Sequence, residues 1–162
     1  MTASSRALYR SRQVLHALWP RIDANDLEAA HRVMTAAEAR LFGAMQRRDQ
    51  RHALEVMRRV QAGTDKRDVL VAALLHDCGK GDVPVWLRIL HVLSPRVGQV
   101  VGKAGDRGWR GAAYRLHRHV ELSEELVREA GGSEVTVRLI GGRHTEDEAW
   151  MAALLWAADD AS

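Results

Sequence analysis

The sequence predicts an all-α protein that folds as a single domain. Runs rich in Ala, Leu, Arg, Glu and Met carry apolar residues at spacings of three and four, the period of an amphipathic helix. Alternating strand patterns are absent except for a weak hint at residues 134–138, and that segment fits a helix capped by Ser133 better. At 162 residues the chain has the length of one domain and can bury a substantial core.

Start and stop signals divide the N-terminal half of the chain into helices. Pro20 ends the first helix, and Gly63 and Gly79 end the fourth and fifth. Thr35 and Glu38 have the spacing of a capping box and predict the start of the third. The five helices are expected over about residues 5–18, 25–33, from 35 onwards, 49–62 and 66–77.

The C-terminal half is also predicted to be helical. Pro84 and Pro95 each stand where a helix could begin its first turn. The glycine-rich stretch at residues 98–111 predicts a loop or a broken helix. Thr145 and Glu148 form a second capping box, which opens the last helix. Before it, helices are expected over about residues 121–130 and 134–142.

Composition and charge limit the classes of partner. The formal net charge is +3, and the densest basic cluster lies at residues 47–51. This cluster is either a solvated helix face or a surface that attracts a small phosphorylated or otherwise anionic substrate. No basic tail and no interleaved aromatic residues support nucleic-acid binding, and no window has the roughly 20 apolar residues of a membrane span. A single cysteine, Cys78, and an N-terminus without an apolar leader suit a reducing cytoplasm.

Imidazole and carboxylate side chains recur along the chain in an order that indicates a metal centre. His76 and Asp77 are adjacent at the end of an apolar run, which packing alone does not explain. Asp159 lies in an apolar part of the last helix, and a buried carboxylate is costly unless it is paired or bound to a metal. Imidazoles and carboxylates together hold iron, manganese or zinc where positions stay open for chemistry. The candidate ligands are His52, His76, Asp77, His119, His144 and Asp159.

Residues 74–80, Leu-Leu-His-Asp-Cys-Gly-Lys, resemble the central motif of the HD superfamily of metal-dependent phosphohydrolases. Three further segments are similar to parts of that family: residues 49–56, residues 119–126, and residues 143–145 followed by 157–159. In the second of these, Ser123 replaces a frequent glycine. The resemblance covers about residues 48–160. It implies a single HD-domain helical bundle with residues 1–47 as an added N-terminal helical region packed on the core.

The extra histidines make the chain look like the two-metal members of the superfamily. In such sites one ion would take His52, His76, Asp77 and Asp159, and the other would take Asp77, His119 and His144. The resemblance implies two iron or manganese ions that clamp the phosphate of a nucleotide or another small phosphoester, with a bridging hydroxide as the nucleophile. Asp77 and Lys80 are the predicted catalytic residues. The predicted substrate contacts are Lys80, Arg143, Arg118 and His117, and for each of these a solvated surface position is the alternative.

Two other functions remain open at this point. Some HD-fold proteins are mixed-valent di-iron oxygenases with the same ligand order and the same lysine spacing, so the motif does not separate hydrolysis from oxygen chemistry. A regulatory domain that binds metal without turnover is the third class. A cyclic-dinucleotide substrate is disfavoured because the family's Gly-Tyr-Pro signature is absent here. A bacterial diadenosine tetraphosphatase group has a more similar ligand order and the same His-Thr pair, and the superfamily's base rates favour hydrolysis.

Overall fold

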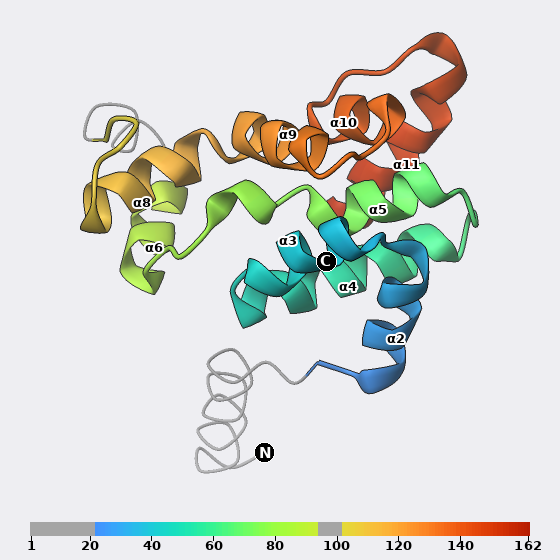
Figure 1. Ribbon diagram of the computed structural model, residues 1–162, viewed down its shortest axis with the longest axis horizontal. Helices are drawn as coiled ribbons and strands as arrows, with labels where there is room; N and C mark the ends of the chain where they lie inside the picture. Colours follow the sequence, from blue (N-terminus) through green and yellow to red (C-terminus); the bar gives the residue numbers. More distant parts are fainter. Residues whose placement is uncertain (1–21, 94–101) are drawn as a thin grey trace, which may run out of the picture.

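The structure is a computed structural model, and it describes residues 22–93 and 102–162. Within these ranges the backbone forms only helices, turns and loops, which confirms the all-α prediction (Figure 1). The helices in chain order are α2 (Ala24–Val33), α3 (Ala36–Ala44), α4 (Arg47–Gln61), α5 (Arg67–Leu75), η1 (Cys78–Lys80), α6 (Val85–Leu93), α8 (Gly108–His117), α9 (His119–Glu129), α10 (Glu134–Ile140), η2 (Glu146–Glu148) and α11 (Ala149–Asp160).

Helix α5 is the centre of the bundle. Every side chain from Val69 to Leu75 is buried, so this helix is apolar on all sides and must be surrounded by others. In Figure 1 it lies between α3 and α4 on one side and α10 and α11 on the other, and it contacts all four. The residues that follow α5 along the chain are therefore delivered into the middle of the molecule.

Helix α4 is amphipathic, and its sequence shows why it packs on α5. Its apolar residues, among them Ala53, Val56 and Val60, are fully buried, whereas Arg51 and Arg58 are exposed. A helix with this pattern gains stability by turning its apolar stripe toward the core. The side chains at the border between the two faces are consequently only partly covered by the bundle.

A second, smaller apolar cluster forms where α6 meets α8, at the left of Figure 1. Arg88 on α6 connects it to α4, because the guanidinium donates to both carboxylate oxygens of Asp49, at 2.8 and 2.6 Å. Arg115 on α8 donates to the backbone carbonyls of Lys80 and Asp82, at 3.3 and 2.8 Å. These two arginines tie the smaller cluster to the main bundle.

Several sequence predictions match the structure closely. Both predicted capping boxes are present, at Thr35 with Glu38 and at Thr145 with Glu148. The helices predicted over residues 25–33, 49–62, 121–130 and 134–142 correspond to α2, α4, α9 and α10 with ends shifted by at most two residues.

Other predictions need correction. The fifth helix ends at Leu75 rather than at residue 77, because the chain turns into η1 at Asp77. The glycine-rich stretch at residues 98–111 runs into a helix that the sequence pattern did not predict, since α8 begins at Gly108. The helix expected over residues 5–18, Pro95 and residues 98–101 lie outside the described residues.

The segment expected to be an N-terminal extension contributes to the main core. Ala30 on α2 and Phe42 on α3 belong to the same buried cluster as α4, α5, α10 and α11, and so does Met45.

In the described ranges, no helix has the length and apolarity needed to cross a bilayer.

Gly79 lets η1 pack directly against α9. A Cβ atom at this position would lie 2.4 Å from the backbone oxygen of His119 and 2.6 Å from the backbone nitrogen of Ser123. The Gly79 amide also donates to the Ser123 hydroxyl at 2.8 Å, and Ser123 is fully buried. Ser123 therefore holds the turn that follows His76 and Asp77.

We predict that Gly79→Ala destabilises the protein. The added methyl group meets backbone atoms that cannot move without displacing α9, and such overpacking costs about 1–3 kcal/mol. Urea denaturation measures the change. Gly43→Ala is the matched control, because nothing lies within 4 Å of a Cβ there and alanine in a helix is favoured over glycine. Equal stability of the two variants would show that η1 does not require this close approach.

Candidate metal centre

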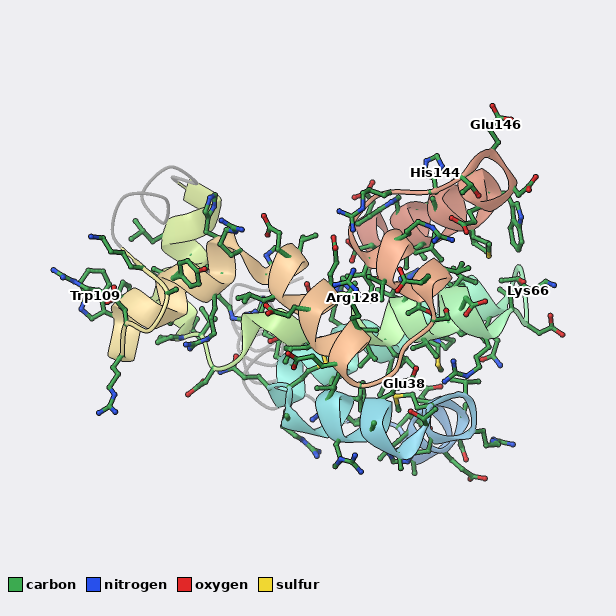
Figure 2. All side chains as sticks on the ribbon, turned by 45° about the horizontal axis from the view of Figure 1, so that its top comes forward. Glu38, Lys66, Trp109, Arg128, His144 and Glu146 are labelled. Carbon is green, nitrogen blue, oxygen red and sulfur yellow. The ribbon has the colours of Figure 1, made fainter. Side chains whose placement is uncertain are left out.

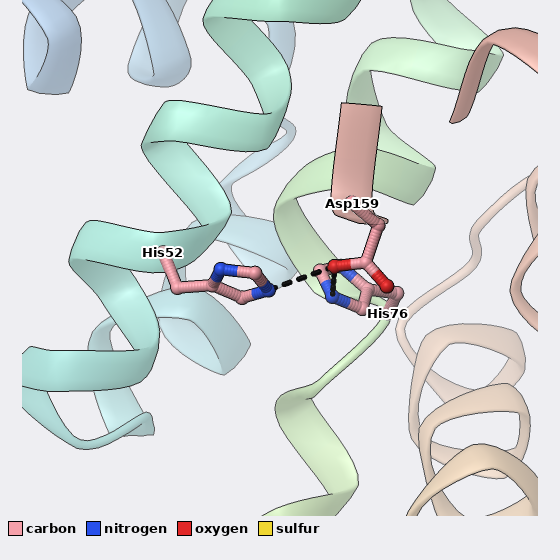
Figure 3. A group of neighbouring side chains, drawn as sticks. All are labelled: His52, His76 and Asp159. Carbon is pink, nitrogen blue, oxygen red and sulfur yellow. Dashed lines mark hydrogen bonds and ion pairs between the residues drawn. The ribbon is translucent and has the colours of Figure 1, made fainter. Parts of the chain in front are cut away.

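Three side chains from three different helices converge beside the end of α5. His52 comes from the middle of α4, His76 is the residue after α5, and Asp159 lies near the end of α11 (Figure 3). The Nε2 atoms of His52 and His76 are 2.8 and 3.4 Å from the same carboxylate oxygen of Asp159. Each of the three residues offers a ligand atom, and these atoms all lie within 4.8 Å of one another.

The hydrogen bonds of His76 leave one ring nitrogen available to a metal. Its Nδ1 lies 3.0 Å from the Ala73 carbonyl oxygen, so a neutral ring carries its proton on Nδ1 and donates it there. Its Nε2 is buried and has no hydrogen-bond partner, which is costly for a polar atom. In histidines that bind a metal, one ring nitrogen usually donates to a backbone carbonyl or a carboxylate, which fixes the tautomer, and the other nitrogen binds the metal. The residues present therefore fit a bound ion.

Asp77 lies between two histidines. Its Oδ2 is 3.6 Å from the Nε2 of His76, and its Oδ1 is 3.7 Å from the Nε2 of His119. The Nδ1 of His119 lies 2.8 Å from the Leu116 carbonyl oxygen, so Nε2 is again the nitrogen directed to the site. Lys80 forms an ion pair with Asp77 Oδ2. This position between the two rings is the one that a bridging carboxylate needs.

The electrostatics of the cluster favour ionised carboxylates. Burial opposes ionisation of Asp77, but the nearby His76 and Lys80 outweigh it and lower the pKa of Asp77. The hydrogen bond with His52 and the nearby His76 ring hold the pKa of Asp159 well below its usual range. Burial lowers the pKa of His76, yet Asp159 and Asp77 together raise it above its usual value. Burial, and then Lys80, lower the pKa of His119, so this ring stays neutral.

The cluster opens into two adjoining cavities. The first, of about 190 Å³, is lined by His52, His76, Asp77, Lys80, His119, Val120, Ile140, Trp156 and Asp159. The second, of about 350 Å³, is lined by Arg48, Asp49, Arg51, His52, Glu55, Asp77, Lys80, Arg88 and Ser162. His52, Asp77 and Lys80 line both, so the two cavities meet at the candidate ligands. The two predicted catalytic residues, Asp77 and Lys80, therefore both lie at this junction.

His144 lies apart from the other candidate ligands. Its side chain is exposed on the loop between α10 and η2, and Figure 2 shows it near Glu146, directed away from the bundle. It lines neither cavity, and its Nδ1 is 3.1 Å from the Thr145 carbonyl oxygen. The structure thus gathers five of the six predicted ligands and leaves this one at the surface.

Three of the predicted substrate contacts also lie outside both cavities. Arg143 pairs with the buried carboxylate of Glu124, and Arg118 pairs with Glu121 on the surface. His117 is exposed. The larger cavity is instead lined by Arg48 and Arg51, which the sequence indicates only as part of a basic cluster. The signal that could have singled them out is their spacing from His52, four and one residues along the same helix.

Cys78 is the residue after Asp77, but its environment does not suit a metal ligand. The thiol is buried, and burial raises its pKa to about 11. Because a thiolate is the form that binds metal, Cys78 acts here as a small apolar core residue.

We predict that Asp159→Asn weakens metal binding much more than Asp160→Asn. Loss of residues that merely support a metal ligand costs about 10–100-fold in affinity, and a direct ligand should exceed that. Asp160 is the matched control, since it is adjacent and exposed. Calorimetric titration with manganese measures both. Unchanged affinity in Asp159→Asn would exclude this carboxylate as a ligand.

We predict that metal affinity falls as the pH is lowered. The raised pKa of His76 means that its ring holds a proton at a higher pH than a free imidazole, and the metal must displace that proton. Below this pKa, release of one proton lowers the affinity on the order of tenfold per pH unit. Titrations between about pH 6 and pH 8 test this, and a flat profile would contradict it.

Comparison with known proteins supports one assignment. The family model described as HD domain matches residues 29–159. No curated protein and no solved structure gives a significant match. The matched region includes α3 to α10 and all six candidate ligands, including the adjacent His76 and Asp77 that give the resemblance its motif. With most of its length covered, this chain belongs to the HD domain family.

Proposed function

We propose that this HD domain is a metal-dependent hydrolase that cleaves a phosphoric ester or anhydride in a nucleotide or another small phosphoester. The observation that carries the proposal is the junction of the two cavities. The metal-ligand cluster of His52, His76 and Asp159 opens directly into a basic cavity that contains Lys80, Arg48 and Arg51. Imidazole and carboxylate ligands beside a basic cavity suit a reaction on a phosphate group.

Two iron or manganese ions are the proposed cofactors. The first ion would be held by His52, His76, Asp77 and Asp159, and the second by Asp77, His119 and His144. We expect the second ion to bind more weakly, because His144 is exposed and only Asp77 and His119 of that set lie together. When bound, such ions neutralise phosphate charge and bring the pKa of coordinated water close to neutrality.

The chain's own residues would orient the metal ligands and give the site its charge. Asp77 and Asp159 are kept ionised by their neighbours, so they can bind cations at neutral pH. The backbone hydrogen bonds of His76 and His119 fix both rings with Nε2 toward the centre. Lys80 keeps an ammonium at the junction of the two cavities, where it can pair with a phosphate oxygen.

We predict that Lys80→Ala keeps its metals but loses activity. An ammonium does not coordinate a metal, and losing a charge-assisted contact costs about 1.5–3 kcal/mol, which is about one to two decades in kcat/KM. Metal analysis and kinetics on the same preparation separate the two effects. Lys66→Ala is the control, since Lys66 is exposed at the start of α5. Lost metal would instead assign Lys80 to support of Asp77.

A substrate screen tests the function itself. Protein loaded with iron or manganese under anaerobic conditions should release phosphate from phosphoesters or nucleotides. The Asp77→Ala variant should be inactive and should lose metal at both positions, whereas His144→Ala should lose one ion at most. Oxygen consumption without phosphate release would replace hydrolysis with oxidative chemistry. Bound metal with neither activity would assign the domain a regulatory role.

A further inference from the structure

We infer that Arg48 and Arg51 form a subsite for a second anionic group of the substrate, next to the group that reacts at the metal centre. The substrate class is then a small molecule with two or more anionic groups, such as a nucleoside diphosphate, a diphosphate ester or a short polyphosphate. The inference rests on the proposed function, because the reacting phosphate is placed among the metal ligands.

The position of the two arginines follows from the helix that carries them. Arg48, Arg51 and His52 are at positions i, i+3 and i+4 of α4, so they share one face of the helix. All three line the cavity of about 350 Å³. Arg48 precedes His52 by one turn, which is about 6 Å along the helix axis. An anion beside these arginines therefore lies within one small ligand's length of the metal site.

The two arginines are the uncompensated charges of this cavity. Of the other charged side chains that line it, Arg88 pairs with Asp49, Lys80 pairs with Asp77, and Glu55 is held by arginines from the next turn of α4. Within the part of the chain that the structure describes, neither Arg48 nor Arg51 forms an ion pair. The segments outside it, residues 1–21 and 94–101, contain no Asp or Glu that could supply one.

The location of Arg48 is unfavourable for the helix. Arg47 and Arg48 stand in the first turn of α4, where the exposed N–H groups create a partial positive charge and acidic residues are favoured. Asp49 is the single acidic residue of that turn, and Arg88 neutralises it. A residue that lowers stability and lines a cavity beside a reaction centre indicates a binding role. The two arginines that line the cavity provide fixed cations that can donate to an anion.

The size of the cavity limits the ligand. About 350 Å³ is near the lower end of the range for small-molecule sites. The lining of the neighbouring cavity of about 190 Å³ includes the apolar residues Val120, Ile140 and Trp156, whereas Arg48 and Arg51 line only the larger cavity. The second anionic group is consequently directed toward α4 and not toward α11.

A pair of phosphonates tests the subsite without requiring turnover. Methylphosphonate has one anionic group and methylenediphosphonate has two, and neither is a hydrolysable ester. Calorimetry on manganese-loaded protein should show that the diphosphonate binds about 10- to 100-fold more tightly, as expected for added charge-assisted contacts. The metal content is measured again afterwards, so that extraction of metal by the diphosphonate is recognised.

Variants assign the preference to the subsite. The double variant Arg48→Ala/Arg51→Ala should bind the two phosphonates equally well, keep its metal, and be at least as stable as the wild type. Arg47→Ala is the matched control, since it removes the same charge from the same turn but lines neither cavity. It should keep the preference for the diphosphonate. A merely structural role for Arg48 and Arg51 would instead lower the unfolding midpoint.

The outcomes separate this inference from the proposed function. Equal binding of the two phosphonates by the wild type overturns the subsite, even if phosphoesters are hydrolysed. The subsite is also overturned if Arg47→Ala loses the preference to the same extent, or if the diphosphonate acts only by removing metal. An arginine-dependent preference supports the subsite, and if no phosphoester is then hydrolysed, the proposed function alone fails.

Discussion

The organisation of this protein depends on the charge that it buries at the end of its central helix, α5. Asp77 is 2% exposed and His76 is 7% exposed, and both follow a run of buried apolar residues, Val69 to Leu75. Such groups are tolerated only when other charges and hydrogen bonds compensate them. Lys80, His119 and Asp159 supply that compensation from η1, α9 and α11, and His52 on α4 pairs with Asp159 in turn. The helices that build the core are therefore the helices that build the site.

The turn after α5 is as important as the ligands themselves. Because α5 ends at Leu75 and η1 begins at Cys78, His76 and Asp77 lie in the turn between them and do not follow helical spacing, so that Asp77 can approach His119 while His76 approaches Asp159. Gly79 allows α9 to come close, and the Ser123 hydroxyl accepts the glycine amide. The local backbone geometry thus directs the side chains of His76 and Asp77 to two different groups of ligands.

The smaller cluster of α6 and α8 is connected to the site through two arginines. Arg88 neutralises Asp49 and closes one wall of the basic cavity. Arg115 donates to the backbone carbonyls of Lys80, the last residue of η1, and of Asp82. The first contact is made by Asp49, the residue after Arg48, and the second by the backbone carbonyl of Lys80. Lys80, Arg48 and Arg51 all line the same cavity. A basic surface patch of the sequence becomes, in three dimensions, one side of a reaction site.

The sequence by itself determined the helical class, most helix ends and the motif of adjacent ligands. These follow from short-range physics, because apolar periodicity and capping boxes act within a few residues, as at Thr35 and Thr145. It also indicated that His52, His76 and Asp159 share a function. Only the tertiary structure decided which ligands meet, since the distance between α4 and α11 depends on how both pack against α5. For the same reason it placed His144 at the surface and Arg48 and Arg51 in the cavity. Long-range packing sets these positions, and the local pattern of residues does not encode it.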